Sequence, residues 1–330
     1  MTGFVSLGFP GTHIVKPPKF LAPMPPSPFN CSYLSLFYEK TMSVAFPLTV
    51  ATVYFTSVHY LNTVVRSRQL KKAGKTKDTL TEVELKKLPA APLACTKTVL
   101  FKLFVMIHNL FLCLYSVWTL LGMCSSMRRT MKEISQILPS NGKVGTFFEA
   151  ACDLQYGFFA KNSTFYRLQM YGWWFYVSKF YEVVDTIIIL LKGKPSSLLQ
   201  SYHHAGAMMC MWAGVRFQSP PIWIFVVFNS FIHSLMYLYF FLSSLKIRVP
   251  NSFKRTLTLM QITQFVAGGS LAVLHAFIWY TDISTNSSVN CLTTAEQALP
   301  LYINVAYLTP LTGLFAAFYI DSYLKRTARK

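Results

Sequence analysis

Seven long apolar stretches constrain the fold of this chain more than any other feature. About 20 apolar residues in a helix cross roughly 30 Å of hydrocarbon, and a helix satisfies its own backbone hydrogen bonds there. The chain is 53% hydrophobic and only 13% charged, which is more apolar than a soluble domain of its length needs to be. We therefore predict an all-α integral membrane protein, a bundle of seven transmembrane helices. The predicted spans cover residues 41–63, 99–123, 167–191, 197–216, 221–244, 257–280 and 299–320.

The basic residues between these spans predict the orientation of the bundle. Segments 64–98, 192–196, 245–256 and 324–330 carry 19 Lys and Arg residues, whereas the alternate segments carry 9. Cytosolic loops are the richer in Lys and Arg, so the N-terminus is predicted to be lumenal and the C-terminus cytosolic. Three N-glycosylation sequons, at Asn30, Asn162 and Asn286, all fall in predicted lumenal segments.

The net charge of +19 is explained by this topology, so we expect no binding of nucleic acid. A secondary role for the cytosolic cations, in holding anionic lipid or a phosphorylated cofactor, stays open. We divide the chain into a lumenal Pro-rich tail (1–39), a seven-span domain (40–324) and a cytosolic basic tail (325–330). The first 40 residues lack a basic segment followed by an apolar core, so no cleaved signal peptide is expected. Cys152 and Cys291 both fall on the predicted lumenal side, where a disulfide between them is a hypothesis.

Polar and ionisable side chains interrupt four of the predicted spans at three- and four-residue spacings. Helices rise 1.5 Å per residue, which places all four groups in the cytosolic half of the bundle. Hydrogen bonds between helices alone would explain isolated amides, but ionisable residues at one shared depth more often form a site. The groups are Lys179, Glu182 and Asp185; Gln200, His203 and His204; Asn229, His233 and Tyr237; and Thr258, Gln261 and Gln264.

These groups indicate acid/base or acyl-transfer chemistry without a metal. A histidine-rich di-iron site would need more histidines than the seven in this chain. Adjacent helical residues such as His203 and His204 also diverge by about 100° and do not easily chelate one ion. Imidazoles and carboxylates can move protons or accept an acyl group, and amides can donate to a thioester carbonyl. The remaining histidines, His13, His59, His108 and His275, are distant from the cluster in sequence.

In this order the four groups resemble the motifs of the ELO family of very-long-chain fatty acid elongases, the membrane 3-ketoacyl-CoA synthases. Gln200 stands where the HxxHH box of the family has its first histidine, and Phe240 replaces the last tyrosine of the third motif. The glutamine is similar to a variant of polyunsaturated-fatty-acid elongases from protists and algae. KxxExxDT is matched by Lys179, Glu182, Asp185 and Thr186; HxxHH by His203 and His204; NxxHxxMYxYY by Asn229, His233, Met236, Tyr237 and Tyr239; and TxxQxxQ by Thr258, Gln261 and Gln264.

The resemblance implies an enzyme of the endoplasmic reticulum membrane that extends a long-chain acyl-CoA by two carbons. Malonyl-CoA supplies the carbons, CO2 and CoA are released, and no cofactor is permanently bound. His203 would be the nucleophile or base, His233 its partner and His204 an orienting residue. Gln200 can still form hydrogen bonds but, unlike the histidine of the family motif, cannot gain or lose a proton. Lys179, Glu182 and Asp185 would position these groups or the CoA substrates.

The resemblance also implies how the substrates bind. The acyl chain would run toward the lumen in a central tunnel between the helices, and the anionic CoA would meet cations at the cytosolic mouth. Expected partners are membrane lipids, the 3-ketoacyl-CoA reductase, dehydratase and enoyl reductase of the elongation cycle, and a second copy in a homodimer. A seven-span lipid transporter or receptor and a non-catalytic scaffold of an elongation complex stay open as alternatives. The binding residues are Asn229, Tyr237, Gln261 and Gln264 for the acyl thioester, Lys192, Lys194, Lys254 and Arg255 for CoA, and Trp173, Trp174, Met208 and Met211 for the tunnel.

Overall fold

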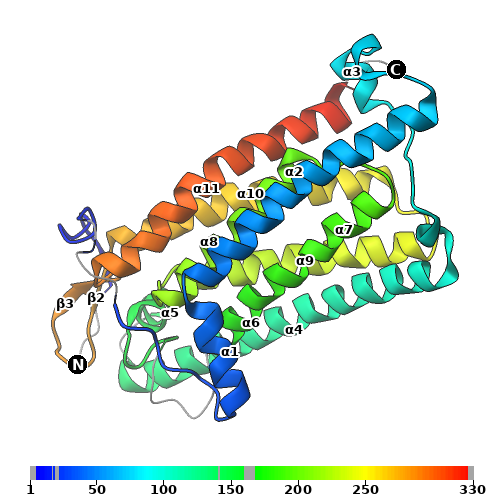
Figure 1. Ribbon diagram of the computed structural model, residues 1–330. Coiled ribbons are helices and arrows are strands. Elements are labelled where there is room, and N and C mark those ends of the chain that lie inside the picture. The colour runs from blue at the N-terminus through cyan, green and yellow to red at the C-terminus, as the bar shows by residue number, and fades with distance from the viewer. Residues whose placement is uncertain (1–4, 17, 19–21, 140–141, 160–167, 326–330) are drawn as a thin grey trace.

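Long helices packed side by side form an elongated bundle (Figure 1). The computed structural model describes residues 5–16, 18, 22–139, 142–159 and 168–325. Figure 1 shows α3 and the end of α11 at one end of the bundle, and α5, β2 and β3 at the other. The helices that build its length are α2 (Ala45–Ala73), α4 (Val99–Ile137), α6 (Leu168–Tyr181), α7 (Val183–Leu191), α8 (Leu198–Arg216), α9 (Ile222–Ser244), α10 (Asn251–Leu274) and α11 (Ala295–Tyr319).

The all-helical membrane architecture is confirmed, whereas the number of spans is smaller by a strict test of length and hydropathy. Among the described residues, four helices are long and apolar enough to cross a membrane: α4, α9, α10 with its extension, and α11 with its extension. A fifth is obtained if α1 (Ser32–Met42) and α2, which meet at a bend of 65°, count as one span. The predicted span 167–191 is interrupted at Glu182, between α6 and α7. α8, predicted as the span 197–216, is not among the four helices, and it carries the polar group that begins at Gln200. Seven spans therefore stay a prediction.

Two helices, α2 and α4, extend well beyond the apolar stretches that predicted them, and α4 continues from residue 123 to Ile137. α2 continues through a basic segment to Ala73 and ends at Gly74, whose φ of +64° suits glycine. Arg66 donates to the Leu85 carbonyl at 2.5 Å, and Arg68 donates to the Ala91 carbonyl at 2.8 Å. These bonds tie the extension to the loop that holds η1 (Lys77–Thr79), α3 (Glu82–Lys86) and η2 (Ala94–Lys97). A hydropathy window detects only the apolar part of such a helix, because Lys and Arg are also good helix formers.

The opposite end of the bundle is covered by a small antiparallel sheet. β1 (Ser6–Leu7) pairs with β2 (Ile278–Thr281), which pairs in turn with β3 (Ser288–Asn290). α10 ends at Leu274 and is followed by η3 (His275–Phe277) and β2, so the predicted span to residue 280 ends in a strand. The described part of 1–39 packs on this end, since the Tyr302 hydroxyl donates to the Ile14 carbonyl at 3.1 Å. The domain boundary at residue 39 stays a prediction, and the tail residues 326–330 and the sequon at Asn162 lie outside the described residues.

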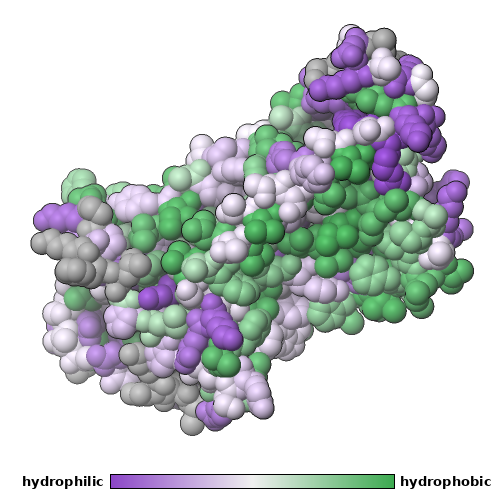
Figure 2. Space-filling view, in the orientation of Figure 1, coloured by the Kyte–Doolittle hydropathy of each residue, from purple (hydrophilic) through white to green (hydrophobic). Residues whose placement is uncertain are grey.

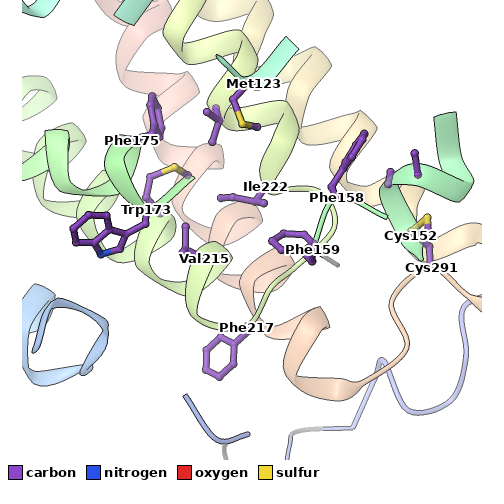
Figure 3. Close-up of a cluster of buried hydrophobic side chains, with 14 of the residues drawn as sticks. Met123, Cys152, Phe158, Phe159, Trp173, Phe175, Val215, Phe217, Ile222 and Cys291 are labelled. Atoms are coloured by element: carbon purple, nitrogen blue, oxygen red, sulfur yellow. A yellow bond between two sulfur atoms is a disulfide. The ribbon is translucent and has the colours of Figure 1, made fainter. Parts of the chain in front are cut away.

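A disulfide between Cys152 and Cys291 confirms the cysteine hypothesis. It joins the end of α5 (Lys143–Cys152) to the residue that follows β3. Figure 3 shows this bridge beside a cluster of buried apolar side chains that includes Phe158, Phe159 and Ile222. The end of the bundle that carries the sheet is therefore held by a covalent bond as well as by packing.

The outer surface of the bundle suits a lipid environment. Figure 2 shows apolar residues over the body of the bundle and hydrophilic residues gathered around the end that carries α3. The exposed face of α4 is apolar at helical spacing, with Leu103, Ile107, Leu114, Trp118 and Leu121 each at least 42% exposed. Exposed apolar surface of this extent marks an interaction with membrane or protein. After the π-helical turn η4 (Ile320–Leu324), the described chain ends near the hydrophilic end.

Candidate functional site

Lys179 and Glu182 form a buried ion pair that connects two of the predicted polar groups. Lys179 Nζ lies 2.6 Å from Glu182 Oε1, and both side chains are 4% exposed. The same Nζ donates to Asn229 Oδ1 at 3.1 Å, and His233 Nδ1 lies 3.7 Å from Glu182 Oε1. Lys179 lies in the last turn of α6, whereas Asn229 and His233 lie on one stripe of α9. The structure therefore brings the third and fifth predicted spans together at these residues.

The histidine pair of α8 meets the same cluster. The ring centroids of His203 and His204 lie 5.4 Å apart, and those of His203 and His233 lie 6.5 Å apart. Gln200 Nε2 lies 2.8 Å from His204 Nε2 and 3.4 Å from Thr186 Oγ1. An amide nitrogen can only donate, so His204 Nε2 accepts and the proton of its neutral ring is assigned to Nδ1. Gln200 thus fixes the tautomer of His204.

Tyr307 on α11 fixes His203, and the sequence motifs did not include it. The hydroxyl of Tyr307 donates to the His203 carbonyl at 2.9 Å, and His203 Nδ1 lies 2.9 Å from the same hydroxyl oxygen. A hydroxyl has one hydrogen, so Nδ1 is assigned as the donor to Tyr307 and the lone pair of the neutral ring lies on Nε2. Gly206 makes the contact between α8 and α11 possible, since a Cβ there would lie 2.2 Å from the Tyr307 ring.

Asp185 is the centre of a second set of hydrogen bonds. Its Oδ2 accepts from the Tyr237 hydroxyl at 2.7 Å, and its Oδ1 lies 2.8 Å from His108 Nε2. His108 Nδ1 lies 3.2 Å from the Tyr181 hydroxyl. His108 is distant from the cluster in sequence but close to it in space, because separation along the sequence says nothing about which helices pack together. α4 packs along α9, and this brings His108 to Asp185.

A pocket extends from these polar groups into the apolar interior. Its polar wall consists of Lys179, His203, Asn229, Gln264 and Tyr307, with Asn304 one helical turn further toward the sheet. Gln264 Oε1 is buried and has no hydrogen-bond partner among the described residues. Because α8 runs away from the α3 end, its later residues place the apolar part of the pocket on the side of the sheet. That part is lined by Phe175, Ala207, Cys210, Met211, Ile224, Phe225, Phe228, Phe265, Gly268 and Leu308.

The other predicted site residues lie outside the lining of this pocket. Gln261 Nε2 lies 3.7 Å from the sulfur of Met236. Arg255 Nε donates to the Tyr319 hydroxyl at 2.7 Å, and Lys254 Nζ lies 5.6 Å from the centre of the Tyr239 ring. The cations Lys192 and Lys194 are exposed where α7 ends.

The predicted tunnel residues separate into two groups. Met211 lines the pocket. Trp173 instead packs in the main core, where its indole N–H donates to Thr41 Oγ1 at 3.0 Å; Trp174 packs against that core, and Met208 is fully buried away from the lining. Among the described residues, no three His, Cys, Asp or Glu side chains are grouped so that they could hold a metal ion.

The fold and the site together define a helical membrane protein with a layer of ionisable side chains at the polar end of an apolar pocket. Residues 40–330 match the model of the ELO family, described as the GNS1/SUR4 family. The match covers most of the chain, so the protein belongs to the ELO family.

Proteins with related sequences carry the names of fatty acid elongases. Fatty acid elongase A of Dictyostelium discoideum is 29% identical over 69% of this chain and 74% of its own length. Fatty acid elongase 2 of Trypanosoma brucei is 29% identical over 48% of this chain and 58% of its own length. Human very long chain fatty acid elongase 3 is 29% identical over 51% and 57%. The chain thus spans less than two thirds of the length of two of these three relatives, and no solved structure matches it significantly.

Proposed function

We propose that this protein is a condensing enzyme of fatty acid elongation, which joins malonyl-CoA to a long-chain acyl-CoA and yields a 3-ketoacyl-CoA. The observation that carries the proposal is the position of His203. Its imidazole lies at the polar end of an apolar pocket, and its Nδ1 is held by Tyr307 so that the lone pair is on Nε2. A thioester group at this end and an acyl chain in the apolar part would match the two halves of the pocket.

The reaction requires a carbanion and a reactive acyl group in a dry site. Malonyl-CoA loses its carboxylate as CO2, and the electron pair of the broken bond forms an enolate. The enolate carbon bonds to the acyl carbonyl carbon, the acyl C–S bond breaks, and the CoA thiolate takes up a proton. Burial excludes water from the thioester, and amide or imidazole donors stabilise the negative oxygen that forms.

The named side chains divide these tasks. His203 acts through Nε2 as the nucleophile or base, and His233 is its partner. His204 is an orienting residue whose tautomer depends on Gln200. Lys179 holds Asn229 in place through the bond of 3.1 Å, and Asp185 holds Tyr237 through the bond of 2.7 Å. Glu182 Oε1 lies 3.7 Å from His233 Nδ1, beyond hydrogen-bond distance, and would attract a positive charge on that ring.

Substrate recognition is assigned to amides inside the pocket and to cations outside it. Asn229 and Gln264 line the polar wall, and Gln264 Oε1, which has no partner in the described part of the chain, suits a donor from the substrate. Tyr237 is fully buried outside the lining of the pocket, so its role is to position its neighbours. Gln261 lies closer to the end that carries α3 and would contact the CoA thioester arm. The phosphates of CoA would meet cations there. These are Lys192, Lys194, Lys254 and Arg255.

The proposal includes the membrane topology. Seven spans would place α3 in the cytosol and the sheet in the lumen of the endoplasmic reticulum, with the N-terminus lumenal and the C-terminus cytosolic. Asn286 lies exposed between β2 and β3 and is the acceptor of a sequon. We expect a glycan on it that an endoglycosidase removes, and that both Asn286→Gln and Ser288→Ala abolish, because each destroys the sequon. A protein whose mobility changes with neither variant would contradict the lumenal assignment of the hairpin.

The proposal also extends to the biological setting. We expect a preference for polyunsaturated acyl chains, association with the 3-ketoacyl-CoA reductase, dehydratase and enoyl reductase of the cycle, and a homodimer. Membranes with the wild-type chain should therefore pass product to those enzymes and favour polyunsaturated primers over saturated primers of equal length. Equal rates with both kinds of primer would refute the preference.

The decisive experiment measures 3-ketoacyl-CoA in membranes supplied with labelled malonyl-CoA and a panel of saturated and polyunsaturated acyl-CoAs. The wild type should form product, and His203→Ala should lower the rate at least about hundredfold, as expected for loss of a nucleophile or base. His275→Ala is the matched control, because His275 is a buried histidine near the sheet, away from the pocket. A folded wild type that forms no product from any primer would refute the proposal and favour a transporter or scaffold. Gln200→His would then be the first reversion to test.

A further inference from the structure

His108 is a buried histidine outside the four sequence motifs, and its contacts lead to the reaction site. Its imidazole is completely buried, and Nε2 lies 2.8 Å from Asp185 Oδ1. Its Nδ1 lies 3.2 Å from the Tyr181 hydroxyl. If Nε2 carries the proton, it donates to the carboxylate while Nδ1 accepts from Tyr181, so both ring nitrogens are used by a neutral imidazole.

The Asp185 carboxylate is thereby fixed from two helices. His108 on α4 holds Oδ1, and the Tyr237 hydroxyl on α9 donates to Oδ2 at 2.7 Å. A carboxylate with one donor at each oxygen cannot rotate without breaking one of the two bonds. Bonds to a charged group are among the stronger hydrogen bonds in proteins. The position of the Tyr237 hydroxyl therefore depends on the bond from His108.

Tyr237 connects this carboxylate to the histidine cluster. Its side chain is fully buried, and its ring packs against the His233 ring with centroids 5.6 Å apart. His233 in turn lies 6.5 Å from His203 between ring centroids. A change in the orientation of Asp185 would therefore reach His233 through one intervening side chain.

We infer that His108 is a positioning residue of the condensation reaction, which acts by holding Asp185 and through it Tyr237 against His233. The inference rests on the proposed function and adds a residue from α4 to its machinery. His108 lies outside the lining of the pocket, so it should affect the rate of the chemical step and leave the binding of either CoA ester nearly unchanged.

The test compares two variants that remove the ring equally but differ in reach. The side-chain amide of His108→Gln can place its nitrogen near the former Nε2 and donate to Asp185, whereas the shorter amide of His108→Asn reaches only the former Nδ1. We expect His108→Asn to lower kcat about tenfold to hundredfold, as loss of a bond to a carboxylate implies. His108→Gln should stay within about threefold of the wild type, and neither variant should change KM for acyl-CoA or malonyl-CoA more than about threefold.

The measurements use the purified full chain, with the midpoint of thermal unfolding recorded for every variant. His275→Gln is the control for a buried histidine, because its ring bonds the Leu271 carbonyl and the Trp223 indole away from the pocket. It should lower the midpoint and leave kcat unchanged. Equal losses of kcat in His108→Gln and His108→Asn would overturn the inference in favour of simple packing. So would wild-type kcat in both variants, or a loss that appears only in KM. A folded wild type without product would refute the proposed function itself, and this role with it.

Discussion

Replacing Gly206 by alanine tests whether Tyr307 positions His203. A Cβ at residue 206 would lie 2.2 Å from Tyr307 Cε2 and 2.4 Å from Cδ2. Carbon atoms prefer separations of about 3.5 to 4.0 Å, so the ring must move by more than about 1 Å. The hydrogen bond between His203 Nδ1 and the Tyr307 oxygen is 2.9 Å long. A displacement of this size takes it beyond hydrogen-bond distance.

The expected effect on catalysis is large and can be given a magnitude. A misplacement of about 1 Å in a reacting geometry can cost about hundredfold in rate, which corresponds to about 2.7 kcal/mol of activation free energy. Overpacking should also lower the free energy of unfolding by about 1 to 3 kcal/mol. Single-turnover formation of 3-ketoacyl-CoA by the purified Gly206→Ala variant measures the first effect, and the midpoint of thermal unfolding measures the second.

Two companion variants make the result specific. Gly269→Ala, on α10, places a Cβ 3.8 Å from Leu308 Cδ1. This is an ordinary contact with α11, the helix that carries Tyr307, so the variant should keep the wild-type rate. Tyr307→Phe keeps the ring and removes the hydroxyl, and should lower the rate about tenfold through the lost hydrogen bond. Gly206→Ala with a wild-type rate would refute the reasoning. So would a loss in Gly206→Ala that Tyr307→Phe does not share.

Three further predictions concern the ion pair, the disulfide and the pocket. Lys179→Met leaves Glu182 buried without its cation and should lower the free energy of unfolding by about 3 to 5 kcal/mol. Adding Glu182→Gln should restore part of the midpoint of thermal unfolding. Additive losses from the two substitutions would contradict the pairing. Replacing Cys152 and Cys291 by serine opens a loop with a sequence separation of 139 residues and should lower the free energy of unfolding by about 4 to 5 kcal/mol. The variant should therefore have a lower midpoint of thermal unfolding than the wild type, and a reductant should not lower that midpoint further. Gly268→Leu should fill the pocket beside Ile224, which lies 3.5 Å from a Cβ built at residue 268. We expect it to lower kcat/KM for the longest acyl-CoA at least about tenfold more than for the shortest, whereas an equal loss for all chain lengths would argue against an acyl chain at this position.

The sequence predicted the long helices of the bundle and most of the contacts between residues of one helix, but not short helices such as α5. Lys179 and Glu182 are three residues apart, so helical periodicity alone places them on one side. The apolar stretches located the helices because apolar side chains are what lipid and the core both require. They did not locate the ends of α2 and α4, since these helices continue through basic and polar residues. The strands β1 to β3 were not predicted, because segments of two to four residues carry no readable alternation.

The contacts between distant helices could not be predicted in the same way. His108 and Tyr307 lie in apolar stretches that contain none of the four motifs, and nothing in those stretches indicates the depth or the rotation of the two side chains. Their roles depend on α4 packing along α9 and on the small Gly206 that lets α11 approach α8. Such contacts are a property of the packed bundle, and only a comparison of many related sequences or a structure reveals them.

The polar layer draws on helices from nearly the whole chain, from α4 to α11, and this has a consequence for biogenesis. If α8 and α11 both span the membrane and insert in the order of synthesis, His203 enters before its partner Tyr307, which lies 104 residues later. Until α11 arrives, the side of α8 that carries His203 lacks its cover, and an uncovered polar group in hydrocarbon is costly. The nascent bundle must therefore be shielded by the insertion machinery or by water until its last helix is in place. The polar layer would then be complete only when the last helix is in place.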